Sequence, residues 1–179
     1  MAAGLDLYTI GHGTAPIEEF IGWLRASDIH SLVDVRRYAG SRHNPQYGSN
    51  ALAESLGAVG ITYRNDVQLG GRRKPSPDSE NTGLRNEAFR AYADYMETDP
   101  FHAAFQVLLS EAEQTQTVVM CSETVWWRCH RRLIADAVLL IAERPVKHIV
   151  SGKVGPHILT EGVRREGSRL RYGIGPLSV

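Results

Sequence analysis

Short continuous apolar runs alternate along the chain with stretches whose apolar residues recur at helical spacing. The helical spacing predicts amphipathic helices after Thr14, after Asn50, over Asn86–Glu97, over Phe101–Gln114 and over about Cys129–Glu143. The continuous runs predict buried strands at Leu5–Ile10, Ser31–Arg36, Ile61–Tyr63, Thr117–Cys121 and Val146–Val150. Because strand and helix alternate, we expect an α/β fold with a mostly parallel sheet and helices on both faces.

The segments between these elements predict caps, loops and one added hairpin. Thr14 and Asn50 are expected to cap the helices that follow them. The segment 68–83 is polar, rich in Gly and Pro and too long for a simple connector, so we interpret it as a lid or binding loop. The tail over His157–Tyr172 contains two Glu-Gly pairs between alternating apolar residues, which predicts a C-terminal hairpin.

Length and composition indicate a single domain over residues 1–179. Of the 179 residues, 42% are hydrophobic and 22% are charged, and 20 basic residues balance 20 acidic ones. A chain of this size buries about 70% of the surface of its unfolded state, which is enough for one core. Zero net charge excludes a general attraction to nucleic acid or anionic lipid, so any anion site must be local.

Neither a membrane span nor a disulfide framework is expected. The longest apolar run, Ala135–Ala142, contains Asp136 and is far too short to cross a bilayer. The first residues lack the basic and apolar regions of a secretory signal, which favours a cytoplasmic protein. Cys121 and Cys129 are expected to remain thiols in that reducing compartment.

The chemically distinctive residues follow the predicted strands. In an open α/β sheet, ligands bind beyond the carboxyl ends of the strands, so we expect these residues to share one cleft. The candidates there are Gly11, His12 and Gly13; Arg36, Arg37, Ser41 and Arg42; Gly70, Gly71 and Arg72; and Cys121, Ser122 and Glu123.

Basic residues are concentrated in the same loops. Between Arg36 and Lys74 stand seven basic residues and only two acidic ones, and Arg128, Arg131 and Arg132 form a second cluster. Arginine forks match phosphate or carboxylate bidentately, so these loops are expected to bind a phosphate, a nucleotide or a nucleic-acid backbone. The alternative is solvated charge with ordinary ion pairs.

The turn Gly11-His12-Gly13 brings backbone N–H groups to the start of a helix, where an anion can bind. It lacks the third glycine of a dinucleotide-binding fingerprint, so by itself it identifies no cofactor, and we expect none. His12 is either a proton donor or a residue that stabilises the turn, since a histidine pKa permits both.

Glu123 is the candidate for acid–base chemistry, with His130 or His12 as its partner. A carboxylate among arginines can activate water or stabilise a developing sugar cation. The alternative is that Glu123 pairs with Arg36 or Arg131 and only holds the pocket together.

Aromatic residues near this turn offer a surface for a base. Trp126 and Trp127 follow Glu123 closely and are expected to stack on the ligand. Four tyrosines elsewhere in the chain are further candidates for stacking: Tyr38, Tyr47, Tyr92 and Tyr95. A second aromatic group fits one helix face and is assigned to packing: Phe89, Tyr92, Tyr95 and Met96.

A metal site would use Cys121, Cys129 and His130, with His12 or Glu123 as the fourth ligand, and these ligand types suit zinc. Their spacing matches no recognised zinc pattern. Adjacent residues on a helix also point about 100° apart, which opposes joint ligation by Cys129 and His130. We therefore expect no metal.

Six segments together resemble the domain of unknown function 488 family, and as a combination in this order they are specific. The resemblance covers roughly residues 7–150, leaving 151–179 as an extension. It implies a compact α/β domain in which these residues form the characteristic set, and it implies no stated reaction. The segments are Tyr8–Gly13, Leu32–Arg37, Ser41-Arg42, Leu69–Arg72, Met120–Glu123 and Cys129–Arg131.

The leading hypothesis is a small enzyme that acts on a nucleotide or nucleic-acid component, with hydrolysis of an N-glycosidic bond in the manner of a DNA glycosylase. Arginines would hold phosphate, aromatic residues would stack the base, and Glu123 would activate water. Two rivals remain open: a non-catalytic nucleotide or nucleic-acid binding module, and a thiol or metal protein that uses Cys121 and Cys129.

Overall fold

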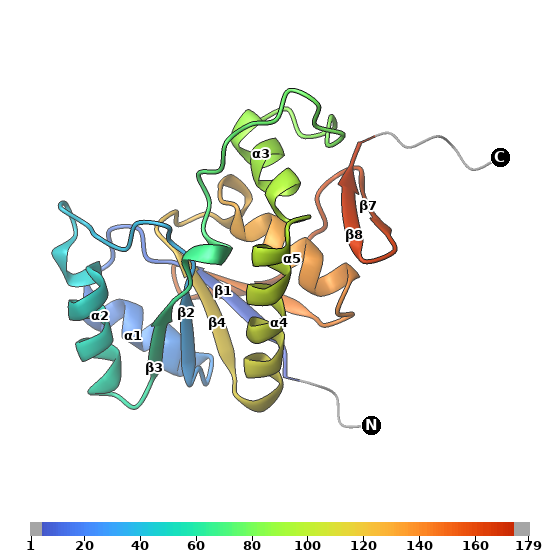
Figure 1. Ribbon diagram of the computed structural model, residues 1–179. Helices are drawn as coiled ribbons and strands as arrows, with labels where there is room; N and C mark the ends of the chain where they lie inside the picture. The colour runs from blue at the N-terminus through green and yellow to red at the C-terminus, as the bar shows by residue number, and fades with distance from the viewer. Residues whose placement is uncertain (1–4, 174–179) are drawn as a thin grey trace.

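The computed structural model describes residues 5–173 and shows an α/β fold built on one main sheet (Figure 1). Its strands follow the order β3-β2-β4-β1-β5-β6. Strands β1 to β5 are parallel and β6 is antiparallel to β5, so the predicted fold class is confirmed. The strands are β1 (Leu7–Gly11), β2 (Ser31–Asp34), β3 (Thr62–Asn65), β4 (Thr117–Cys121), β5 (Val146–Val150) and β6 (Lys153–Pro156).

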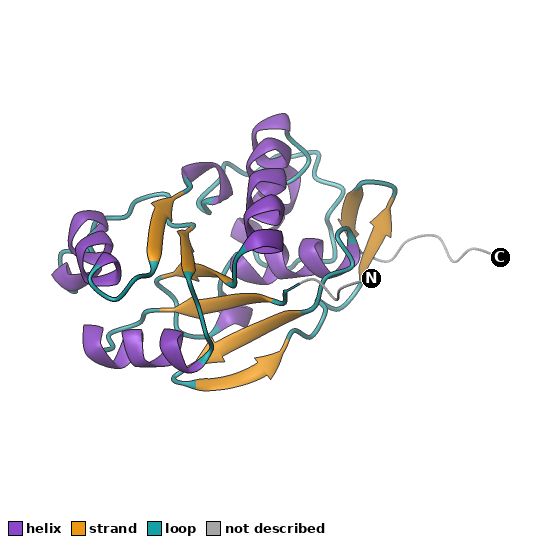
Figure 2. Ribbon diagram, turned by 90° about the horizontal axis from the view of Figure 1, so that it is seen from below, coloured by secondary structure: helices purple, strands orange, loops and turns teal. Residues whose placement is uncertain are grey.

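Helices cover both faces of this sheet (Figure 2). Helices α1 and α2 lie on one face, while α3, α4 and α5 lie on the other. Their bounds are Ile17–Ala26 for α1, Ser49–Gly57 for α2, Glu87–Tyr95 for α3, Asp99–Gln114 for α4 and Arg131–Leu140 for α5.

Strand β4 lies inside the sheet and is buried along its whole length, as its uninterrupted apolar run predicted. Its alternate side chains enter two different cores: Val118 and Met120 pack with α1 and α2, and Val119 and Cys121 pack with the helices opposite. Successive residues of a strand point to opposite faces, so a strand covered on both sides is apolar throughout.

Several helix boundaries differ from the sequence expectations. Helix α3 ends at Tyr95, and α4 begins at Asp99, so that Pro100 lies in its first turn and does not separate the two helices. Pro16, not Thr14, precedes the first turn of α1, and Gly48 instead of Asn50 precedes α2, with no side-chain cap in either case. Helix α5 begins only at Arg131, because the preceding residues form the short 3₁₀ turn η3 (Trp126–Arg128) and an extended residue. Helix ends depend on local hydrogen bonding, which residue preference predicts only approximately.

The C-terminal hairpin is present as β7 (Val163–Glu166) and β8 (Arg169–Tyr172), which pair antiparallel. Leu170 and Tyr172 anchor it to the core on the α5 side. Strand β6 was not predicted, because it lies at the exposed sheet edge and carries no alternating apolar pattern.

The long segment 68–83 is fixed to the body of the protein along much of its length. It begins at the 3₁₀ turn η2 (Val67–Leu69). Arg73 stacks 3.5 Å above the ring centre of Tyr95, and Asn81 Nδ2 donates to Asp94 2.8 Å away. Of this segment, Gly71 and Arg72 line the main cavity.

Among the described residues, no helix combines the length and the apolar character that a membrane span requires.

Candidate functional site

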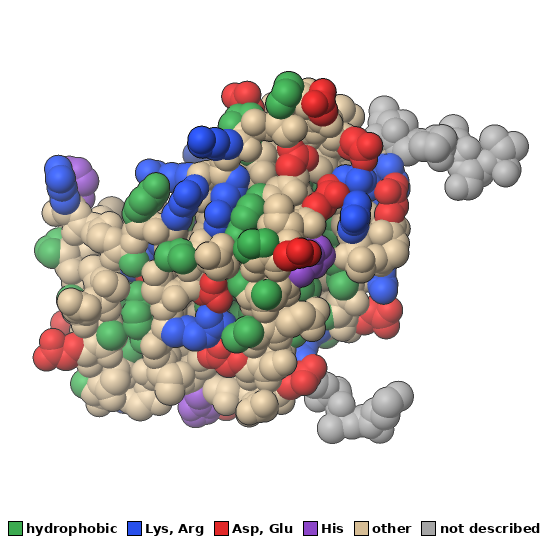
Figure 3. Space-filling model, in the orientation of Figure 1, with side chains coloured by type: hydrophobic (Ala, Val, Ile, Leu, Met, Phe, Trp, Pro, Cys, Tyr) green, Lys and Arg blue, Asp and Glu red, His purple; other side chains and the backbone are tan. Residues whose placement is uncertain are grey.

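A cavity of about 590 Å³ opens at the carboxyl edge of the sheet. Because β4 is inserted between β2 and β1, the loops that follow these three strands converge there. Figure 3 shows Lys and Arg side chains gathered over the upper part of the molecule, where these strands end in Figure 1. The predicted residues that line the cavity are His12, Gly13, Arg36, Arg37, Ser41, Arg42, Gly71, Arg72, Cys121, Ser122, Glu123 and His130.

Four exposed arginines give the cavity its positive charge: Arg37, Arg42, Arg72 and Arg128. None of them makes an ion pair with a carboxylate in the part of the chain that the structure describes, and Glu123 is the one acidic lining residue there. Arg72 has a positive φ of 57°, an uncommon conformation outside glycine, and its carbonyl accepts from Arg37 at 2.7 Å. The loops therefore present uncompensated guanidinium groups.

Arg36 differs from these four because its charge is already balanced. It is buried, and Nε and Nη2 donate to the Asp34 carboxylate at 2.9 and 2.6 Å. Tyr63 also donates to Asp34, at 2.8 Å. Arg36 thus forms part of the pocket wall and carries no free charge for a ligand.

His12 has both ring nitrogens occupied. Nδ1 lies 2.8 Å from the Gly13 carbonyl, which can only accept, so Nδ1 carries the proton. Nε2 then accepts from Arg36 at 3.3 Å. Burial lowers the pKa of His12 to about 4, and the ring stacks on Tyr47 with a centroid distance of 4.0 Å. This geometry favours the interpretation of His12 as a neutral residue that orders the turn.

Glu123 lies exposed at the rim of the cavity. Its main-chain carbonyl accepts from Arg131, whereas its carboxylate makes no ion pair among the residues that the structure describes. Arg36 is engaged by Asp34 instead. The alternative in which the Glu123 carboxylate orders these two arginines therefore lacks the contacts it requires.

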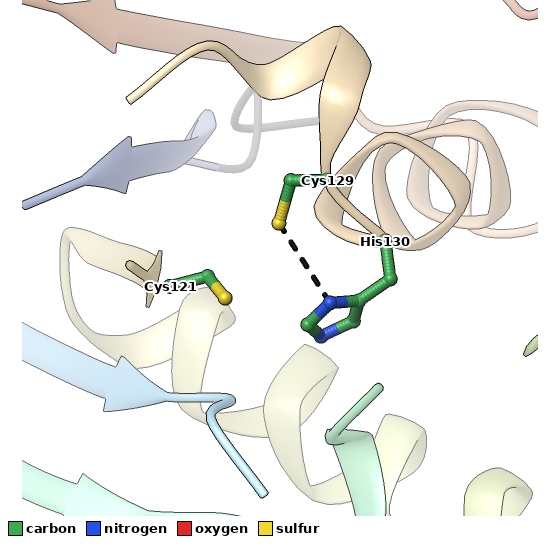
Figure 4. A group of neighbouring side chains, drawn as sticks. All are labelled: Cys121, Cys129 and His130. Atoms are coloured by element: carbon green, nitrogen blue, oxygen red, sulfur yellow. Dashed lines mark hydrogen bonds between the residues drawn. The ribbon is translucent and has the colours of Figure 1, made fainter. Parts of the chain in front are cut away.

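Cys121, Cys129 and His130 meet at the wall of the cavity (Figure 4). One potential ligand atom from each lies within 4.8 Å of the others. The expected divergence of Cys129 and His130 is wrong, because Cys129 has extended φ and ψ angles of −124° and 149° and precedes α5. The two side chains can therefore turn toward the same point.

The pKa values of the two thiols are shifted in opposite directions. A hydrogen bond with Cys129, reinforced by burial, raises the pKa of Cys121 well above its usual range. Burial opposes ionisation of Cys129 as well, but the Cys121 hydrogen bond and the charge of Arg131 together lower the pKa of Cys129. Nε of Arg131 donates to the Cys129 sulfur at 3.3 Å.

A chain of buried hydrogen bonds connects Arg131 to Asp136. Arg131 reaches Thr9 at 3.5 Å, and Thr9 lies 2.7 Å from His148. His148 contacts His157 at 2.9 Å, and His157 contacts Asp136 at 2.9 Å. With neutral imidazoles, every donor points along the chain toward the Asp136 carboxylate.

Two glycines allow the site loops to close on one another. A Cβ atom at Gly11 would stand 1.7 Å from the main-chain oxygen of Glu123, and one at Gly71 would stand 2.9 Å from Nδ1 of His130. Real side chains do not fit at such distances. These residues thus admit neighbouring protein groups; Gly71 also lines the cavity, whereas Gly11 does not.

A comparison with protein families supports the resemblance that the sequence motifs indicated. The family model described as "Domain of unknown function DUF488" matches residues 16–138, more than half of the chain. The chain belongs to the DUF488 family. No curated protein and no solved structure matches it. The DUF488 match includes Arg36, Arg72 and the Cys121–His130 region, and it leaves His12 and the C-terminal hairpin outside.

Five predicted site residues of this DUF488 protein lie outside the cavity lining: Gly11, Gly70, Trp126, Trp127 and Arg131. Trp126 stacks on His148 with a ring-centre distance of 4.2 Å, because η3 turns it toward the buried histidines. Arg131 is fully buried beneath the wall. Trp126 and Arg131 thus lie behind the cavity wall, and contact of any of these five residues with a ligand stays a prediction.

Other lining residues were missed by sequence reasoning. They include His43 in the loop after β2 and Phe89 on α3. Tyr38 and Tyr92, two of the tyrosines considered for stacking, also line the cavity. The helical spacing assigned Phe89 and Tyr92 to the core, and both do pack there, but each also has a face toward the cavity.

Proposed function

We propose that this protein binds a phosphate-bearing nucleotide or nucleic-acid component in the cavity and hydrolyses its N-glycosidic bond. The observation that carries the proposal is the set of four cavity arginines that have no carboxylate partner among residues 5–173. Exposed guanidinium groups on a shared concave surface attract phosphate, with which they form paired, charge-assisted hydrogen bonds.

An aromatic surface beside these arginines supports a nucleotide as the ligand. The Tyr38 side chain is 64% exposed at the cavity, and the guanidinium groups of Arg37 and Arg72 each lie 5.9 Å from its ring centre. Phe89 contributes a second partly buried ring to the lining. Rings next to cations can stack a base while the phosphate is held alongside.

The uncommitted carboxylate of Glu123 supports hydrolysis as the reaction. In the proposed step, Glu123 takes a proton from water as the water oxygen bonds to the anomeric carbon. The glycosidic C–N bond breaks, and its electron pair leaves with the base, which is then protonated from solvent. The arginines hold the phosphate away from this carbon, so binding and chemistry use different residues.

Binding is tested first, with nucleoside monophosphates, the matching unphosphorylated nucleosides and a short single-stranded oligonucleotide. Calorimetry at low salt should detect the phosphorylated probes only. Arg72→Ala and Arg37→Ala should each weaken binding about tenfold to a hundredfold, the range expected for a hydrogen bond to a charged group. Arg25→Ala is the matched control, because Arg25 is exposed on α1 and lies outside the cavity lining. Equal affinity for nucleosides and nucleotides would refute the proposal.

Chemistry is tested with the same probes by chromatographic detection of released base. Glu123→Gln keeps the size of the side chain and removes its basicity, so turnover should fall about a hundredfold or more while binding persists. An unchanged single-turnover rate would remove Glu123 from the mechanism. Binding without base release from any probe would identify a binding module and refute the hydrolytic half.

A further inference from the structure

We infer that Cys121, Cys129 and His130 form a binding site for a zinc-class divalent metal ion whose fourth coordination position opens into the cavity. This departs from the expectation drawn from their sequence spacing. The three residues come from the end of β4 and from the turn just before α5, and Figure 4 shows their side chains directed toward one region. The inference does not depend on the proposed function, because anion binding by the arginines requires no metal.

The separations of the ligand atoms fit tetrahedral coordination after small side-chain rotations. Zinc bonds sulfur at about 2.3 Å and imidazole nitrogen at about 2.0–2.1 Å, which places neighbouring ligand atoms about 3.6–3.8 Å apart. Cys129 Sγ and His130 Nδ1 are already 3.7 Å apart, and the complete set lies within 4.8 Å. Two sulfurs and an imidazole select zinc or a similar ion over Mg²⁺ or Ca²⁺, which prefer oxygen ligands.

Two further observations support metal binding. One is a buried cation beside the Cys129 sulfur, and the other concerns the ring nitrogens of His130. Arg131 is fully buried, makes no ion pair with a carboxylate in the described region, and donates to Cys129 Sγ. A buried cation requires a nearby negative charge, and a thiolate supplies one. His130 offers two ring nitrogens as the ligand atom: Nδ1 lies 3.7 Å from Cys129 Sγ, and Nε2 is buried without a hydrogen-bond partner among the described residues.

The site has the ligand number of a catalytic metal centre. Structural zinc takes four protein ligands, whereas catalytic zinc takes three and leaves one position for water or substrate. All three residues line the cavity, so a fourth ligand would enter from there, on the side where Glu123 and the arginines lie. Zinc binds cysteine as the thiolate, so any thiol proton that Cys121 or Cys129 carries passes to solvent on binding.

The test uses the full-length protein, stripped with a chelator and then titrated with Co²⁺ alone. We expect about one Co²⁺ per chain, a thiolate-to-cobalt charge-transfer band in the near ultraviolet, and visible bands of tetrahedral cobalt. Adding Zn²⁺ should abolish both sets of bands. Proton release in weakly buffered solution should accompany binding.

Cys121→Ser, Cys129→Ser and His130→Asn should each lower the affinity for Co²⁺ at least a hundredfold, since losing even outer-shell partners costs about 10–100-fold. His43→Asn is the matched control, because His43 lines the same cavity outside the cluster and its variant should bind as wild type. Circular dichroism of each variant establishes that it is folded.

Spectra without a thiolate charge-transfer band, or equal affinity in the folded His130→Asn and His43→Asn variants, would overturn the inference. Absence of Co²⁺ uptake by the fully reduced protein would overturn it as well. None of these outcomes affects the Arg72→Ala comparison, so failure of the metal site is distinguishable from failure of the proposed function.

Discussion

Gly11 ends β1 at the point where the turn after β4 crosses it. The absence of a side chain there lets the Glu123 carbonyl approach and accept from Arg131, which in turn contacts Cys129. Gly11, which lies outside the cavity lining, thereby helps to position Glu123 and Cys129, which both line the cavity. The geometry of the cavity wall therefore depends on how closely main-chain segments approach one another as well as on its reactive side chains.

Gly11→Ala should destabilise the protein by about 1–3 kcal/mol, the usual cost of forcing extra atoms into a packed site. The new methyl group would overlap the Glu123 main chain and displace the turn. Gly22→Ala is the control, because Gly22 lies in α1 with open space around it, and alanine should stabilise the helix by about 0.5–1 kcal/mol. Chemical denaturation of both variants gives the comparison, and equal stabilities would contradict it.

At the scale of elements, α5 connects the cavity wall to the C-terminal hairpin. Arg131 begins the helix beside Cys129, and Asp136, one turn further on, is buried under the hairpin. Asp136 accepts from His157 at 2.9 Å, from the Thr160 main chain at 3.0 Å and from Tyr172 of β8 at 3.0 Å. Asp136, the polar residue within the apolar run of α5, is therefore the point at which the C-terminal segment is hydrogen-bonded to this helix.

Asp136→Asn should lower the free energy of unfolding by about 2–4 kcal/mol. The asparagine amide would turn a donor toward partners that are themselves donors, leaving buried groups unsatisfied. Asp78→Asn on the exposed loop should change stability by less than about 0.5 kcal/mol. Urea titrations measure both, and hydrogen exchange should show the hairpin losing protection first. A near-native Asp136→Asn protein would show that the carboxylate is dispensable.

At the scale of the whole molecule, burial of neutral histidines couples stability to pH. His12 lies after β1 and His148 lies in β5, and both are almost fully buried. Burial lowers the pKa of His12 to about 4 and, together with the proximity of His157 and Arg131, that of His148 to about 3, from the ordinary 6.5. Between these values the unfolded chain binds more protons than the folded one, so stability falls as the pH falls below 6.5.

From about pH 7 to about pH 5, each of these histidines should remove about 2 kcal/mol from the free energy of unfolding. The measurement is a series of urea titrations across this range. His148→Gln should reduce the dependence on pH by about half, whatever its effect on absolute stability, because glutamine does not titrate. His43→Gln is the control, because His43 is exposed and makes no ion pair among the described residues. Equal slopes for wild type and His148→Gln would contradict the buried-histidine explanation.

The sequence by itself determined the architecture and the edge that carries the cavity. Strands β4 and β5 have the bounds that their apolar runs predicted, and the other parallel strands differ by a few residues. Because a strand buried on both faces must be apolar throughout, the signal is local and can be read from the chain. Parallel connectivity then brings the loops after β1, β2 and β4 to one edge, so the group from His12 to Glu123 could be anticipated.

Only the tertiary structure decided which of these groups are free. Arg36 and Arg37 are adjacent, yet Arg36 is neutralised by Asp34 and Arg37 is not, because successive side chains take different directions from the strand end. A shift of two residues in the start of α5 brought Cys129 and His130 to Cys121. Ion pairs and ligand clusters depend on distances between segments far apart in sequence, and spacing along the chain does not specify them.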